Sequence, residues 1–140
     1  MKTILYPAPQ QLFRAFMTPA LAERGIVLPI GTRNPPKLPE YWIRHESNGG
    51  PRGEGGATWN VQMVSKYFDR DDDRGENTAV LIHQLMMDAA GVEVTLPGGS
   101  PFPWIVRTRH VSGPVNLTDE DRPELECYQS AVEWSLCPIP

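Results

Sequence analysis

The sequence predicts an α+β fold, with a mostly antiparallel sheet of four to five strands and two helices packed on one face. Two observations lead to this prediction. Only two stretches carry apolar residues at helical spacing, whereas the other patterned stretches alternate apolar and polar residues as strands do. The 15 prolines and 12 glycines indicate short elements joined by ordered turns. With 140 residues, the chain is expected to form one domain over residues 1–140.

The first helix is expected to begin near Pro9 and to end at Gly25, which stands where a helix cap would lie. Its apolar residues at helical spacing are Leu12, Phe13, Phe16, Met17, Ala20 and Leu21. Pro19 interrupts this pattern, because proline lacks a backbone N–H and crowds the carbonyl of Ala15. We therefore expect a helix in two parts, either kinked at Pro19 or restarted there with Thr18 as the N-cap.

Two strands separated by a glycine-rich loop are expected next. A short extended run over residues 25–30 leads into a surface loop, because the three prolines of residues 35–39 cannot join a central strand. Residues 41–46 and 57–68 then alternate as the two strands of a hairpin. The loop between them, residues 47–56, is longer than a tight turn requires, so it is either disordered in the free protein or in contact with something.

An aspartate run over residues 69–77 imitates a calcium-binding loop. Carboxylates stand at alternate positions, on Asp69, Asp71 and Asp73. A loop of the EF-hand type also needs Gly at its sixth position and Glu at its twelfth, where this sequence has Arg74 and Val80. No bound metal is therefore expected in this run.

The second helix is expected over residues 78–91, where a broad apolar face ends at Gly91. Asp73 is followed three residues later by Glu76, which resembles a capping box, and acidic residues suit the positive end of a helix. The aspartate run is therefore interpreted as the approach to this helix.

Three further strands complete the expected sheet, over residues 92–96, 103–111 and 128–136. Gly113 and Pro114 interrupt the alternation after the second of these strands, because proline has no donor with which to continue the pairing. We expect the chain to bend there and to cross to the last strand through an acidic segment.

The titratable residues form no catalytic or metal-binding pattern. His45, His83 and His110 fall on three different elements, and no Ser or Cys stands in a nucleophile elbow. The only cysteines, Cys127 and Cys137, do not match a zinc spacing, and one strand would hold them roughly 33 Å apart, so they are interpreted as reduced thiols. We expect neither enzyme activity nor a cofactor.

The charge and hydropathy of the chain limit its partners. A formal net charge of −4 and a pI near 5.3 argue against nucleic acid, whose binding needs clustered Lys and Arg. No run approaches the roughly 18 apolar residues of a membrane helix, and the first residues are too broken by proline for a signal peptide. A soluble, cytoplasmic protein without a membrane partner is expected.

Five blocks, taken in order, carry a resemblance to a known family. They are LAERGIVLPIGTRNPP, YWIRHESNGGP, WNVQMVSKYFD, AVLIHQLMMDA and VSGPVNLTDEDRPELECYQSAVEWSL. Together they resemble the tail terminator proteins of long-tailed phages of actinobacterial hosts. In such proteins the last block typically has a Ser-Gly-Pro turn, a short acidic linker and a closing strand with an aromatic residue near its start, here Tyr128.

The resemblance implies a structural role without catalysis. A tail terminator assembles as a hexameric ring on the last ring of the tail tube, stops the polymerisation of the tube and presents a surface to the head connector. The partners implied are further copies of the chain, the tail tube protein and a head-tail connector or head-closure protein. The implied location is the host cytoplasm during assembly and the neck of the virion afterwards.

Four charged residues are the expected contact residues in such an assembly. Arg52 and Glu54 lie in the glycine-rich loop, and Arg44 and Arg107 are candidate charges of the ring interface. Each of them could equally be a solvated surface charge.

Three alternatives remain open at this point. The chain could be another neck protein, of the head-closure or tail-completion type. It could be a small metal-binding hydrolase built around the aspartate run and His83, or a ligand-binding α+β domain.

Overall fold

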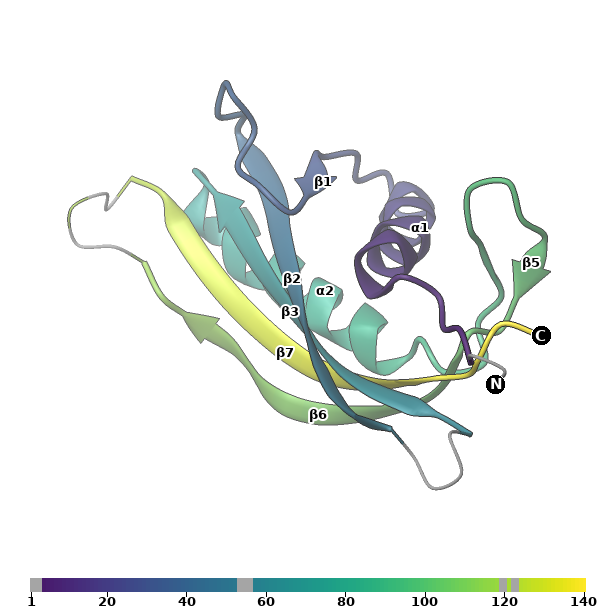
Figure 1. Cartoon of the computed structure of the whole chain (residues 1–140). Coiled ribbons are helices and arrows are strands. Elements are labelled where there is room, and N and C mark those ends of the chain that lie inside the picture. The colour runs from purple at the N-terminus through teal and green to yellow at the C-terminus, as the bar shows by residue number, and fades with distance from the viewer. Residues whose placement is uncertain (1–3, 53–56, 119–120, 122–123) are drawn as a thin grey trace.

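The computed structural model of the chain describes residues 4–52, 57–118, 121 and 124–140. These residues form two α-helices, a five-stranded main sheet and a separate two-stranded sheet (Figure 1). The elements in chain order are α1 (Pro9–Ala22), β1 (Ile30–Gly31), β2 (Tyr41–Arg52), β3 (Trp59–Asp69), α2 (Asp72–Met87), β4 (Val94–Thr95), β5 (Pro101–Phe102), β6 (Ile105–Asn116) and β7 (Glu126–Leu136). Neither described helix is long and apolar enough to cross a membrane.

The main sheet has the strand order β1-β2-β3-β7-β6. The short β1 pairs with β2 in parallel, and the three other neighbouring pairs are antiparallel. β4 and β5 pair with each other, so the strand expected over residues 92–96 belongs to the small sheet and not to the main one. The expected α+β class and the mostly antiparallel sheet are confirmed, and β1 supplies the fifth strand.

Both helices pack against the same face of the main sheet, which we call the inner face. Trp134 of β7 contacts Phe13 and Phe16 of α1, with ring centroids 6.0 and 5.6 Å apart. Its indole Nε1 donates a 3.0 Å hydrogen bond to the carbonyl of Met86 in α2. One side chain thus joins both helices to the sheet, and the opposite, outer face carries no helix in the described part of the chain (Figure 1).

The first helix does not restart at Pro19, so the alternative with Thr18 as the N-cap is wrong. α1 is one α-helix with Pro19 inside it, and its buried residues lie on both sides of that proline: Leu12, Phe13, Phe16, Met17 and Leu21. Because these side chains are anchored in the core, their burial outweighs the backbone hydrogen bond that Pro19 cannot make. The expected end is confirmed, since Gly25 has a φ of +75° and Ile26 donates its backbone N–H to the carbonyl of Leu21.

α2 begins six residues earlier than expected, at Asp72, and its cap is Asp71 rather than Asp73. The Oδ1 atom of Asp71 accepts hydrogen bonds from the backbone N–H groups of Asp73, at 3.0 Å, and Arg74, at 3.2 Å. Arg74 occupies the position at which a capping box would need Glu or Gln, so the expected Asp73–Glu76 capping box is wrong.

The expected hairpin of β2 and β3 is confirmed, but most of the predicted loop over residues 47–56 is strand. β2 continues to Arg52, whose backbone pairs with Trp59. Glycine permits this, because a Cβ atom on Gly50 would lie 2.6 Å from the carbonyl oxygen of Asn60. Trp59 in turn donates a 3.0 Å hydrogen bond from Nε1 to the carbonyl of Gly50. The tip of the hairpin, residues 53–56, lies outside the described residues.

The prediction that Gly113 and Pro114 end the pairing of β6 is also wrong. The register shifts between Ser112 and Val115, and then the pairing with β7 resumes at Val115 opposite Gln129. Gly113 has a φ of +92°, and a Cβ atom on it would lie 2.3 Å from the carbonyl oxygen of Gln129. The residue is therefore a bulge that only glycine fits, and the strand continues beyond it.

The last strand is confirmed as β7, and both cysteines are free thiols. Cys127 lies on β7, whereas Cys137 lies just beyond its end and contacts the carbonyl oxygen of Pro103 at 3.8 Å. The expected reduced state of the two cysteines agrees with this arrangement.

Candidate interaction surface on the outer face of the sheet

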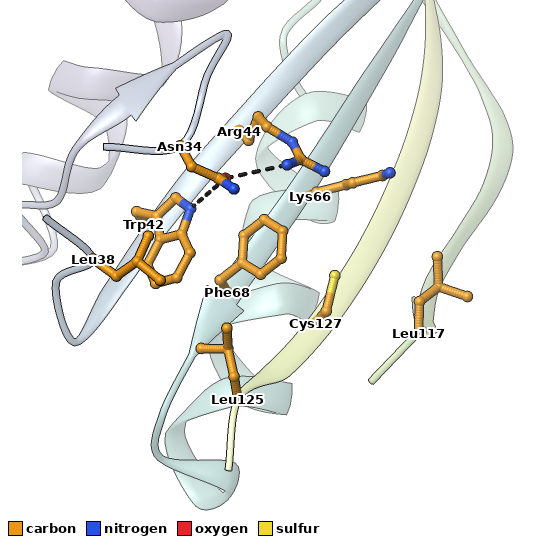
Figure 2. Close-up of a pocket in the computed structure, with 9 residues that line it drawn as sticks. All are labelled: Asn34, Leu38, Trp42, Arg44, Lys66, Phe68, Leu117, Leu125 and Cys127. Atoms are coloured by element: carbon orange, nitrogen blue, oxygen red, sulfur yellow. Dashed lines mark hydrogen bonds between the residues drawn. The ribbon is translucent and has the colours of Figure 1, made fainter. Parts of the chain in front are cut away.

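A hollow of about 510 Å³ opens on the outer face of the main sheet, and we call it the outer groove (Figure 2). Its walls come from the loop before β2, from β2, β3 and β7, and from the ends of the β6–β7 connection. The lining residues are Asn34, Leu38, Trp42, Arg44, Lys66, Phe68, Leu117, Leu125 and Cys127. Segments that are distant in the sequence therefore build a single surface.

Two stacked aromatic rings form the floor of the outer groove. Trp42 of β2 and Phe68 of β3 are direct partners in the strand register, so their side chains leave the sheet side by side. Their ring centroids are 4.8 Å apart with an interplanar angle of 12°. Trp42 is only 1% exposed, which makes the floor rigid as well as apolar.

Two cations also line the outer groove. Arg44 and Lys66 are also direct partners in the register of β2 and β3. The guanidinium of Arg44 lies over the Phe68 ring, 5.3 Å from its centroid, and Nη1 donates to Asn34 Oδ1 at 3.2 Å. The same Oδ1 accepts from Trp42 Nε1 at 3.2 Å, so Asn34 holds both side chains in place (Figure 2).

The outer groove has a positive charge that its described lining residues do not balance. No carboxylate belongs to its lining residues, and Lys66 makes no salt bridge in the described part of the chain. Like charges directly opposite each other on a sheet repel each other, and Glu46, which lines an adjoining hollow with Arg44 and Lys66, supplies one negative charge against these two. An anionic group placed in the groove would relieve this repulsion.

Cys127 lines the outer groove but is a poor nucleophile. Burial raises the pKa of its thiol, and the nearby charges of Lys66 and Arg44 only partly oppose that effect. The thiolate is the reactive form of cysteine, so the raised pKa keeps this side chain inert near neutral pH.

The four expected contact residues do not come together. Arg44 lies in the outer groove, whereas Arg107 is exposed on β6 opposite Ser135. The β7 residues that lie level with Arg44 and with Arg107 are six residues apart in the strand register, which is roughly 20 Å along the strand. Glu54 lies outside the described residues, and of Arg52 only the backbone is described.

A second charged feature lies where β3 ends and α2 begins. The carboxylate of Asp69 is fully buried and accepts from Tyr67 Oη, from Arg74 Nε at 2.9 Å and from Arg74 Nη2 at 2.6 Å. Burial alone would raise the pKa of Asp69, but these hydrogen bonds and one from the backbone N–H of Asp71 outweigh it and lower the pKa. Asp69 therefore stays ionised and ties the end of β3 to α2.

Because Arg74 is engaged by Asp69, the neighbouring acidic residues are left largely unbalanced. We call the exposed residues Asp71, Asp72, Asp73 and Glu76 the acidic turn. Carboxylate oxygens of Asp71, Asp72 and Asp73 lie within 4.8 Å of one another. Asp71 is the N-cap of α2, so its presence is explained by its structural role. The acidic turn is thus a negative surface at the start of α2.

The residues that a hydrolase would need are separated in space. His83 is eleven residues, roughly 16 Å, along α2 from Asp72. Its Nε2 lies 3.1 Å from Nδ1 of His110, and burial together with His110 lowers its pKa. His45 is instead buried beneath α1, stacked on Phe13. The structure thus brings two of the three histidines together, but not with the aspartates.

Sequence reasoning identified Arg44 but missed the residues around it. Trp42 and Arg44 share one face of their strand by alternation, and so do Lys66 and Phe68 of theirs. The sequence does not reveal the strand register, which places Trp42 opposite Phe68. In comparisons with known proteins, no family model and no curated protein matches the chain.

Proposed function

We propose that the chain is the tail terminator of a long-tailed phage. In this role it assembles as a hexameric ring on the last ring of the tail tube, stops its polymerisation and offers a surface to the head connector. The five sequence blocks that resemble the family support the proposal. The place of action is the neck of the virion.

The observation that carries the proposal is the free edge strand β6. It is 12 residues long, it ends the strand order, and only β7 pairs with it in the described part of the chain. Three of its valines are exposed: Val106, Val111 and Val115. A long open edge with exposed apolar side chains is a template for contact with another protein chain, as an assembly protein requires.

Electron microscopy of a phage whose copy of this gene is interrupted tests the proposal. Tail length and head attachment are scored in the same lysates, with the gene supplied in trans as the control. We expect overlong tails without heads beside filled capsids, because the tube has no stop and no surface for the connector.

Two other results would contradict the proposal. Tails of normal length that fail to join heads would assign the chain to another position in the neck, as a head-closure or tail-completion protein. Normal virions would exclude an essential assembly role altogether.

A further inference from the structure

The structure carries two unbalanced and opposite surfaces, the outer groove and the acidic turn. We infer that the acidic turn of one copy of the chain docks in the outer groove of the next copy. This contact would be the interface by which the ring closes, so the inference rests on the proposed function. Its partner is a second copy of this chain.

Charge complementarity is the first reason. The described residues that line the outer groove include Arg44 and Lys66 but no carboxylate, and Glu46 lies with these two cations in the adjoining hollow. The acidic turn presents exposed carboxylates, and the neighbouring Arg74 is held by Asp69 in a salt bridge of 2.6 Å. Because Asp71 is occupied as the helix cap, Asp72 and Asp73 are the carboxylates free to bind Arg44 and Lys66.

The relative placement of the two surfaces is the second reason. Lys66 and Phe68 point to the outer face at the end of β3, and the chain then turns through Asp71 into α2 on the inner face. The end of β3 and the start of α2 lie at the same end of the sheet (Figure 1), so the outer groove and the acidic turn lie near that end, one on each face. A contact between two different patches is heterologous, and it closes a ring when the rotation that it sets between neighbouring copies closes.

The apolar part of the outer groove is the third reason. Leu117 is 48% exposed at its rim, on the far side of Cys127 from the stacked floor of Trp42 and Phe68 (Figure 2). A neighbouring copy seated here would cover this leucine and remove water from the charged pairs, which strengthens their attraction. The same surface thus offers both apolar area and fixed charges.

Sedimentation velocity of the purified chain tests the inference over the full range of soluble concentrations. The variants are Lys66→Glu, which reverses a charge in the outer groove, and Asp72→Lys/Asp73→Lys, which reverses the acidic turn but keeps the Asp71 cap. We expect wild-type chains to associate and each variant to raise the dissociation constant at least about tenfold. Added salt should weaken the wild-type association in the same direction.

Mixing the two variants gives the sharpest result. The Lys66→Glu chain keeps an intact acidic turn, and the Asp72→Lys/Asp73→Lys chain keeps an intact outer groove. The mixture should therefore associate, although neither variant associates strongly alone. Arg24→Glu, an equal charge reversal on the exposed end of α1, is the control and should associate as wild type does.

Circular dichroism must show the same folded spectrum for every variant. Association of Lys66→Glu at the wild-type strength would overturn the inference and leave the proposed function standing. A wild-type chain that stays monomeric at every concentration would also overturn it, and the tail-length experiment would then decide the proposed function separately.

Discussion

At the scale of single residues, His45 is the most unusual side chain in the core. It is 1% exposed, stacks on Phe13 with a centroid distance of 4.5 Å, and neither ring nitrogen has a hydrogen-bond partner among the described residues. Burial, and then the positive charge of Arg14, lower its pKa from 6.5 to about 4. The imidazole is therefore neutral in the folded chain over the whole range near neutral pH.

This pKa predicts how stability depends on pH. Between about pH 6.5 and pH 4 the unfolded chain binds a proton at His45 and the folded chain does not. The free energy of unfolding should therefore fall as the pH drops through this window, by up to about 3 kcal/mol from this residue. His45→Leu should remove that part of the fall, as measured by urea unfolding at several pH values. An equally steep fall in the variant would show that other groups cause it.

At the scale of elements, the start of α2 shows how a short local pattern sets a boundary. The Asp71 side chain satisfies two backbone N–H groups of the first turn, and Asp69 two residues earlier binds Arg74 of the same turn. The helix therefore begins at a fixed point relative to β3. The aspartate run that imitates a calcium loop is accounted for by these contacts.

The cap predicts unequal effects of neighbouring aspartates. Asp71→Ala should lower the free energy of unfolding by about 1 kcal/mol, because two backbone N–H groups lose their acceptor. Asp72→Ala, the matched control, should change it by less than about 0.5 kcal/mol, because its carboxylate is exposed. Urea unfolding measures both. Equal losses would mean that Asp71 acts only through its charge, and a lost metal-dependent activity would favour the hydrolase instead.

At the scale of the whole molecule, one apolar core lies between the inner face of the sheet and both helices. Trp134 is fully buried at its centre and contacts α1 and α2 at once. The strands that flank it in the register are β3 and β6, so most of the sheet depends on the same cluster. Such an arrangement should fold as one cooperative unit, in agreement with the expected single domain.

Trp134→Ala tests this cooperativity. It should lower the free energy of unfolding by about 3–5 kcal/mol, because it leaves a cavity between three elements. Circular dichroism and tryptophan fluorescence should still report one coincident transition in wild type and variant. Transitions that separate in the wild-type chain would indicate more than one folding unit. Val106→Ala on the exposed edge is the control and should have little effect.

The sequence by itself determined the class of fold, the two helices, the hairpin of β2 and β3 and the last strand. These features follow from the period of apolar residues, which is local and needs no knowledge of neighbours. The sequence-based predictions were wrong where contacts with a distant part of the chain outweighed the effect of a local proline or glycine. Pro19 stays inside α1 because the core anchors both sides of it, and β6 continues past Gly113 because β7 lies alongside.

The candidate site was decided only by the tertiary structure. Arg44 could be named from the sequence, but its partners Lys66, Trp42, Phe68 and Asn34 come from the strand register and from a loop that folds back over β2. Alternation assigns a residue to one face of its own strand, whereas register, which is a long-range property, decides which side chain stands opposite. The juxtaposition of Arg44, Lys66 and two stacked rings therefore exists only in the folded chain.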